Sequence, residues 1–137
     1  MNAKPFKLTP PKPFIPTEFE EQCQVFDYAH WKERTDPRWK LLFATLNGVR
    51  LPIGLAKKMK RAGMKAGVLD IWLPIIRRFY DGNICNVGLV IDIKRRKGGA
   101  VSDAQEWWAD QLRSQLWRVD FCKGAKSAIA TIEEYLG

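Results

Sequence analysis

The stretch GLVIDIK, residues 88–94, is the most informative part of this chain for its fold. An apolar run ends on an acid and a lysine, Asp92 and Lys94. Side chains in a strand alternate between its two faces, so Asp92 and Lys94 share one face and the isoleucines beside them share the other. Two neighbouring charges on one face of an apolar strand are expected either to pair or to take part in chemistry.

A second apolar segment, GVLDIWLP at residues 67–74, contains Asp70. If the two segments are adjacent strands, Asp70 and Asp92 lie within reach of one cation, and the backbone carbonyl of Ile93 offers a neutral oxygen beside them. Lys94 is then placed to orient a water molecule or to neutralise a phosphate. Taken singly, an Asp-x-Lys strand is more often an exposed ion pair, and an acid such as Asp70 more often marks a strand end. Together the residues indicate metal-dependent cleavage of a phosphodiester.

The composition favours a nucleic-acid partner. The chain has 137 residues, a net charge of +8 and a pI near 9.6. This length fits one domain, and such a basic surplus favours a polyanion, nucleic acid before an anionic membrane. Because no apolar run reaches the roughly 18–20 residues that span a bilayer, we expect DNA and no membrane as partner. The N-terminus does not read as a secretory signal.

The cysteines and the histidine narrow the choice of metal. Cys23, Cys85 and Cys122 are widely spaced without a Cys-x-x-Cys motif, which favours reduced thiols and a cytoplasmic location. The single histidine, His30, excludes multi-histidine zinc sites. A bound cation would therefore have oxygen ligands, which indicates Mg²⁺ or Mn²⁺. His30 continues a helix face that begins at Phe19, so a packed or rim position is favoured over a catalytic base.

The order of elements predicts an α/β fold, a mixed β-sheet flanked by α-helices. Residues 1–16 read as a proline-rich basic arm, either a disordered tail or a contact to DNA backbone or a partner subunit. Residues 17–137 form the folded domain. Capping patterns at Thr17 and Ser102 open two of its helices, and Asn47-Gly48 ends its first strand. We expect helices at about 18–33, 53–62, 102–117 and 127–136, strands at 41–46, 67–74, 88–94 and 118–122, and a hairpin connection at 77–83.

Five blocks in order resemble the VRR-NUC branch of the PD-(D/E)xK nuclease superfamily. They are TEFEEQ (17–22), LLFATLNG (41–48), GMKAGVLDIWLP (63–74), GLVIDIKRRKGGAVSDAQEWWADQL (88–112) and FCKGAKSAIATIEEYL (121–136). The resemblance implies a restriction-endonuclease-like core and Mg²⁺-dependent cleavage of DNA. It also implies a homodimer that acts on structured DNA, such as branched DNA or a Holliday junction, in DNA repair, recombination or processing.

The resemblance assigns roles to individual residues. Asp70 corresponds to the first metal-binding acid, Asp92 to the second, and Lys94 to the catalytic lysine. Glu18 resembles a helix glutamate that approaches the metal directly or through water, although any acid is favoured in a first helical turn. Gln105 resembles a glutamine that supports the lysine or contacts phosphate, although it also fits a capping box with the serine three residues before it.

Three further positions qualify these assignments. Gln22 matches another polar position of the family's first helix. The family usually has Glu where this chain has Asp92, so metal distances or metal preference are expected to differ. Leu69 precedes Asp70 where the superfamily name has proline, a structural rather than a chemical departure.

Two basic clusters are candidates for DNA-backbone contact, which gives sequence-independent and salt-sensitive binding. The ordinary alternative for the cluster at residues 57–65 is the solvated face of a helix. Trp107 and Trp108 are adjacent, so only one of them can face the core squarely. The other lies at a rim or at an interface, or it stacks on a base of the nucleic acid. The clusters consist of Lys57, Lys58, Lys60, Arg61 and Lys65, and of Arg95, Arg96 and Lys97.

The sequence therefore predicts a Mg²⁺-dependent DNA endonuclease. Two alternatives stay open. One is a non-catalytic nucleic-acid-binding module whose acids only satisfy lysine and arginine. The other is a regulatory subunit that uses a nuclease fold for protein contacts.

Overall fold

The computed structural model describes residues 14–45 and 50–137. Most of the predicted arm, residues 1–13, and the Asn47-Gly48 turn lie outside the described residues. None of the helices within the described ranges is both long and apolar enough to cross a membrane.

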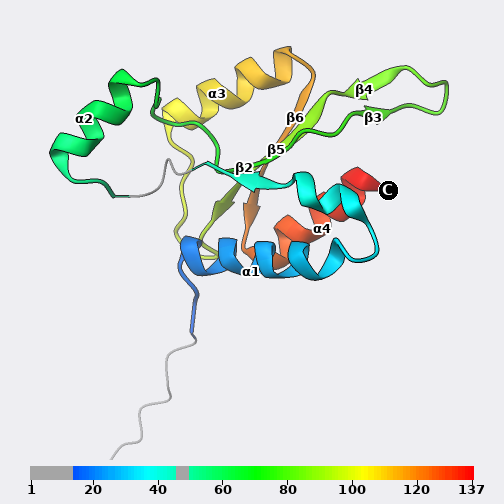
Figure 1. Cartoon of the computed structure of the whole chain (residues 1–137), viewed down its shortest axis with the longest axis horizontal. Coiled ribbons are helices and arrows are strands. Elements are labelled where there is room, and N and C mark those ends of the chain that lie inside the picture. The colour runs from blue at the N-terminus through cyan, green and yellow to red at the C-terminus, as the bar shows by residue number, and fades with distance from the viewer. Residues whose placement is uncertain (1–13, 46–49) are drawn as a thin grey trace, which may run out of the picture.

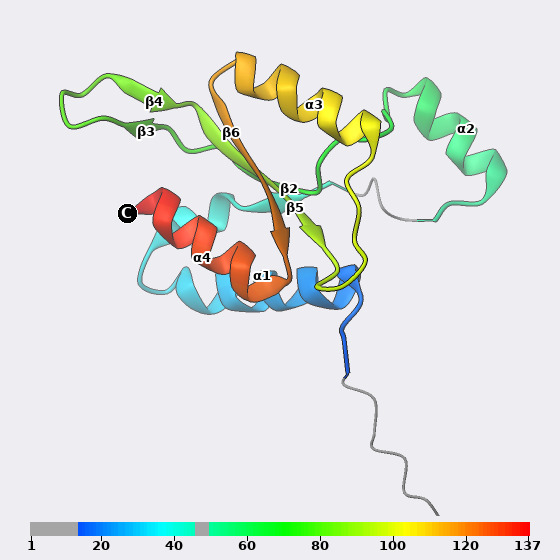
Figure 2. The ribbon, with the colours of Figure 1, turned by 180° about the vertical axis from the view of Figure 1, so that it is seen from behind.

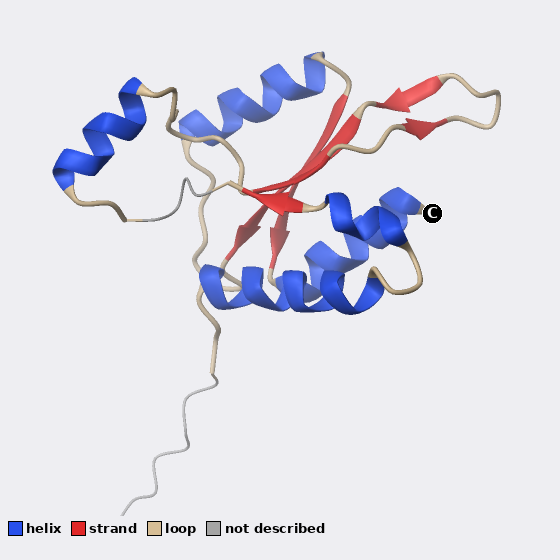
Figure 3. Cartoon of the chain, in the orientation of Figure 1, coloured by secondary structure: helices blue, strands red, loops and turns tan. Residues whose placement is uncertain are grey.

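A four-stranded mixed sheet forms the centre of the molecule, with helices on both faces (Figures 1 and 3). The strand order is β1-β2-β5-β6, in which β2 runs antiparallel to β1 and β5, and β6 runs parallel to β5. This arrangement confirms the predicted fold class. The strands are β1 (Phe43–Ala44), β2 (Ile71–Leu73), β5 (Gly88–Lys94) and β6 (Trp117–Lys123).

The two faces of the sheet carry separate cores. The helix α3 (Asp103–Ser114) covers one face, and α1 (Glu18–Lys32) and α4 (Ala125–Leu136) cover the other, as the two opposite views show (Figures 1 and 2). Alternation along β5 explains the division. Val90 packs with Leu69 and Ala109 on the α3 face, whereas Ile91 and Ile93 belong to the core under α1 and α4.

The helix ends follow the predicted capping patterns. Thr17 Oγ1 accepts from the backbone N–H of Glu20, whose carboxylate accepts from the N–H of Thr17. Ser102 and Gln105 form the same reciprocal pair at the start of α3. On α1 the buried side chains include Val25 and not His30, whose side chain is 80% exposed beside Glu33. The histidine is therefore on the outside of the protein.

The strand expected at 41–46 is mostly replaced by a short 3₁₀ helix, η1 (Pro37–Leu41), followed by the two residues of β1. The Asp36 carboxylate accepts from the N–H of Arg38 and so caps this turn, which Pro37 begins. Trp39 is buried in the core, and this tertiary packing outweighs the strand propensity of the segment.

The strand expected at 67–74 begins only at Ile71. Gly67 has a φ of +82°, and a Cβ there would lie 2.6 Å from the Cβ of Ala104 in α3. The chain therefore turns sharply beside α3 before it enters β2, and this turn places Asp70 at the start of the strand.

Two elements project from the sheet (Figure 1). The helix α2 (Ile53–Arg61) matches its predicted bounds but buries none of its side chains. The strands β3 (Arg77–Arg78) and β4 (Ile84–Asn86) form a separate two-stranded hairpin. Its turn is the predicted one, since Gly82 has a φ of +87° and Asp81 accepts from the N–H of Asn83.

Candidate active site

The end of β5 holds a buried ion pair. Asp92 is 1% exposed and Lys94 is 7% exposed. Lys94 Nζ lies 2.8 Å from Asp92 Oδ2. The alternation predicted from the sequence thus places both charges on the α3 face, and they pair with each other.

Gln105 connects this pair to α3. Its Oε1 accepts from Lys94 Nζ at 2.7 Å and from the backbone N–H of Ser102 at 3.1 Å. Its Nε2 donates to Asp92 Oδ2 at 3.2 Å. Both interpretations of this glutamine therefore hold, because one side chain caps the helix and orients the lysine and the aspartate.

Asp70 lies beside Asp92 across the β2–β5 pair. Ile71 pairs with Ile91, so continuing this antiparallel register by one residue sets Asp70 opposite Asp92. Burial, a hydrogen bond to Asp92 and the negative charge of that carboxylate together raise the pKa of Asp70 to about 8. Two carboxyl groups are thus held together in a place that disfavours a second negative charge.

The Ile93 carbonyl and Glu18 are on the same edge of β5 as Asp70. Backbone polar groups of successive residues point to opposite edges of an extended strand. The Lys94 carbonyl accepts from the N–H of Gly124 on the β6 side, so the Ile93 carbonyl points toward the β2 side. The N–H of Arg95 also points there, and it donates to Glu18 Oε1 at 3.3 Å.

A small hollow lies between Glu18 and Asp70. It has a volume of about 110 Å³ and opens between the first turn of α1 and the start of β2. Glu18 also contributes to the raised pKa of Asp70, which places the two carboxylates within electrostatic reach. The hollow is lined by Glu18, Phe19, Gln22, Thr45 and Asp70.

The residues fit a Mg²⁺ ion that keeps part of its water shell. Within the described ranges, no three Asp, Glu, His or Cys side chains gather closely enough to form a ready-made metal cage. Mg²⁺ does not require such a cage, since one or two carboxylates and substrate phosphates often suffice. Asp92 Oδ1 is buried and has no hydrogen-bond partner, which is costly unless a cation or a proton satisfies it. The crowding at Asp70 would be relieved in the same way.

The predicted basic residues lie in two places, on or just after α2 and in the loop after β5. Lys57, Lys58, Lys60, Arg61 and Lys65 are all exposed, on or just after α2. Arg95 and Lys97 are exposed in the loop after β5. Arg96 differs because its guanidinium forms an ion pair of 3.1 Å with the buried carboxylate of Glu21.

Glu21 and Thr45 are the residues near the site that the sequence did not reveal. The second oxygen of Glu21 accepts from the N–H of Ala125 and so caps the start of α4. The N–H of Thr45 donates to the Asp70 carbonyl at 2.7 Å, which fixes the backbone of that acid. The i, i+4, i+8 spacing of Glu21, Val25 and Ala29 was the available signal, an acid on the buried stripe of a helix.

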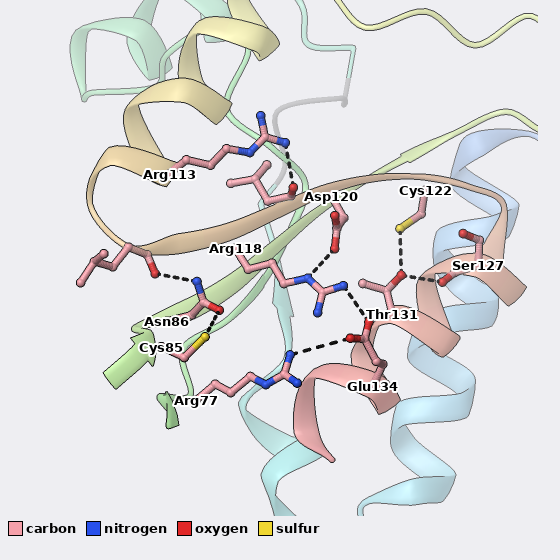
Figure 4. Close-up of polar contacts among 12 residues, drawn as sticks. Arg77, Cys85, Asn86, Arg113, Arg118, Asp120, Cys122, Ser127, Thr131 and Glu134 are labelled. Atoms are coloured by element: carbon pink, nitrogen blue, oxygen red, sulfur yellow. Dashed lines mark hydrogen bonds and ion pairs between the residues drawn. The ribbon is translucent and has the colours of Figure 1, made fainter. Parts of the chain in front are cut away.

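A second charged cluster lies on the opposite face of the sheet (Figure 4). Arg118 Nε lies 2.9 Å from Asp120 Oδ2, and its Nη2 lies 2.7 Å from Glu134 Oε2 on α4. Arg77 from β3 reaches the other oxygen of Glu134 at 3.8 Å. The hydrogen bond to Glu134 raises the pKa of Arg118, and the same contact lowers the pKa of Glu134.

Comparisons with known proteins add a structural relative. No family model matches the chain, and no curated protein matches it. A solved structure described as a VRR_NUC domain protein is similar, with a TM-score of 0.69 and 26% sequence identity over 88% of this chain and 88% of that chain. The structural similarity agrees with the family resemblance that the sequence blocks indicate. The chain therefore shares the mixed α/β fold of this VRR_NUC domain protein.

Proposed function

We propose that residues 17–137 form a Mg²⁺-dependent DNA endonuclease domain. One observation carries the proposal: Asp70 and Asp92 crowd together at the end of a strand pair, beside a buried lysine. A carboxyl group that faces a hollow and has a strongly raised pKa, as Asp70 does, is typical of a functional site. The relation to VRR-NUC domain proteins supports the same reading.

The roles of the residues follow from their positions. Asp70, Asp92 and the Ile93 carbonyl would hold Mg²⁺, with Glu18 at the same edge, and Mn²⁺ suits the same oxygen ligands. When bound, the cation lowers the pKa of water and neutralises charge on the scissile phosphate. Lys94 orients the attacking water or stabilises the phosphate as negative charge develops. Gln105 keeps the lysine in place.

The exposed basic residues bind the DNA backbone. Those on and after α2 and those after β5 flank the site from two sides in the sequence, which suits contact with phosphates on either side of the scissile bond. Such contacts are lost steeply as salt increases. We include Arg96 among them, although its pairing with Glu21 reduces its availability.

The finer substrate and assembly are also part of the proposal. We infer a homodimer that nicks branched DNA, including Holliday junctions, in repair, recombination or processing. The hairpin of β3 and β4 exposes large apolar side chains, Phe79, Tyr80 and Ile84 among them, which suits a protein contact. All three cysteines are free, in keeping with the reducing cytoplasm of a bacterial or phage-infected cell.

One observation favours a non-catalytic alternative. Lys94 and Asp92 satisfy each other at 2.8 Å, as expected of a nuclease fold retained for DNA binding or as a regulatory subunit. That alternative gives no reason for the unpartnered Asp92 Oδ1 or for the crowding of Asp70. Catalysis therefore accounts for more of the geometry.

Nicking of supercoiled plasmid with Mg²⁺ or Mn²⁺ tests the proposal. We expect Asp92→Ala and Lys94→Ala to reduce the nicking rate by about 100-fold or more, the size of effect seen when a group that stabilises the transition state is removed. The matched control is Asp120→Ala, which removes an aspartate of the opposite face and should leave nicking unchanged. A wild type that binds DNA without cleaving it, or active site variants that cleave normally, would refute the enzyme. A panel of junction, flap and linear duplexes then resolves the substrate, and sedimentation resolves the dimer.

A further inference from the structure

A second, apolar hollow lies beside the candidate active site. It has a volume of about 490 Å³ and lies between the start of α3 and the loop that leads into β2. Ala104 is next to Gln105 on α3, and Ala66 lies four residues before Asp70 in the loop, so both walls belong to segments that also carry active site residues. The hollow is lined by Lys65, Ala66, Ala104, Trp107 and Trp108.

The two tryptophans in this hollow differ in their attachment. Trp108 is half-buried, and its Nε1 donates to the Ala66 carbonyl at 3.1 Å, so it holds the loop against α3. Trp107 is 57% exposed, and its ring lies edge-on to that of Trp108 at 5.3 Å. Trp107 therefore has an accessible aromatic surface next to a neighbour that is fixed in place.

The charge around the hollow indicates the kind of ligand. Lys65 is the charged residue of the lining, and the exposed lysines of α2 precede it in the chain. A flat aromatic group attached to a phosphate matches this combination, and single-stranded nucleic acid is bound in that way, with bases stacked on aromatic side chains and phosphates on lysines. Bases within a duplex already stack on each other, so only an unpaired base can enter. The volume is within the range of small-ligand pockets.

We propose that this hollow binds an unpaired base of the DNA substrate by stacking on Trp107, with Lys65 on the adjoining phosphate. The inference rests on the proposed function, because it takes DNA as the ligand. It adds a reason for choosing structured DNA over plain duplex, since branch points, gaps and flaps supply unpaired nucleotides close to the scissile bond.

Binding measured with EDTA present, where no cleavage occurs, tests the inference separately from catalysis. The probes are a duplex with a three-nucleotide gap that contains 2-aminopurine, and the same duplex fully paired. For Trp107→Ala we expect about 5- to 150-fold weaker binding to the gapped DNA, the range for loss of one stacked base, and unchanged binding to the duplex. Quenching of the 2-aminopurine emission should be lost, and Trp107→Phe should restore it in part.

Trp31→Ala is the matched control, since Trp31 is also exposed, at 59%, but belongs to α1 on the other face of the sheet. It should bind both probes as the wild type does. Equal weakening of both probes by Trp107→Ala, no weakening of either, or an equal effect of Trp31→Ala overturns the inference. If the wild type binds neither probe, both the inference and the proposed function are refuted. Selective loss without any nicking activity supports the base site and refutes the catalytic proposal.

Discussion

The charged side chains on the two faces of the central sheet are balanced in different ways. On the α4 face, the guanidinium of Arg118 lies between Asp120 and Glu134, and Arg77 reaches Glu134 as well (Figure 4). Two bases match two acids, and each pKa that shifts does so toward the charged form.

On the α3 face the balance is reversed. Asp70 lies within electrostatic reach of the Asp92 carboxylate and of the Glu18 carboxylate from the first turn of α1, and Lys94 is the cation that pairs with Asp92. The pKa of Asp70 is raised toward the neutral form, and one oxygen of Asp92 has no partner. A cluster that serves only stability has no reason to keep such an excess of acid, so the difference distinguishes a candidate active site from a structural ion-pair network.

The largest expected difference between the two clusters is the loss of stability when the cation of each is removed. Lys94→Met leaves the buried Asp92 carboxylate without a paired cation, and we expect the free energy of unfolding to fall by about 3–5 kcal/mol. Arg118→Met leaves acids that water reaches, and we expect a loss of about 1 kcal/mol or less. Urea unfolding in the presence of a chelator measures both. Equal losses would mean that the two clusters do not differ in kind.

A pH series should show the acid excess directly. The folded protein holds the proton of Asp70 up to a pKa of about 8, whereas the unfolded chain releases it near 3.8. The folded state therefore binds more protons between these values, and without metal the stability contributed by this group falls as pH rises from about 4 to about 8.

Asp70→Asn should lack that fall, so in chelator it should melt above the wild type at pH 8 and close to it at pH 4. Mg²⁺ should raise the melting temperature of the wild type at pH 8 and not that of the variant. Asp120→Asn serves as the control and should follow the wild type. Parallel curves for the wild type and Asp70→Asn would show that the pKa of Asp70 is not raised in the folded protein.

The smallest effect separates the two roles of Gln105. Ser102→Ala and Gln105→Ala each break the capping box and should each cost about 1 kcal/mol of stability. Only Gln105→Ala also frees Lys94, so it alone should slow plasmid nicking, by about tenfold for one lost hydrogen bond of about 1.4 kcal/mol. Equal nicking rates for both variants would show that Gln105 acts only as a helix cap.

The sequence was sufficient where a short-range pattern decides the structure. Alternation along β5 predicted that Asp92 and Lys94 share a face. The capping pattern at Ser102 predicted the start of α3 and identified Gln105 as its candidate capping-box residue. The two apolar runs led us to expect Asp70 and Asp92 on adjacent strands, and the structure pairs these strands in the antiparallel direction.

Tertiary packing decided the rest. The burial of Trp39 replaced most of an expected strand with a 3₁₀ turn, and the close approach of Gly67 to Ala104 delayed the start of β2. Neither contact has a local signal. Glu21 shares a helix face with Val25 and Ala29, but the contact of its carboxylate with the start of α4 has no local signal in the sequence. The exposure of α2 was equally hidden, because its pattern of apolar residues is that of a packed helix.

Binding of Mn²⁺, measured by electron paramagnetic resonance at pH 8 without DNA, tests the central claim most directly. If the acid excess of the α3 face is a cation site, the wild type and Asp120→Asn bind Mn²⁺ alike, and Asp70→Asn and Asp92→Asn bind it at least about tenfold more weakly. Equal binding by all four proteins, or equal weakening by Asp120→Asn, would contradict the claim.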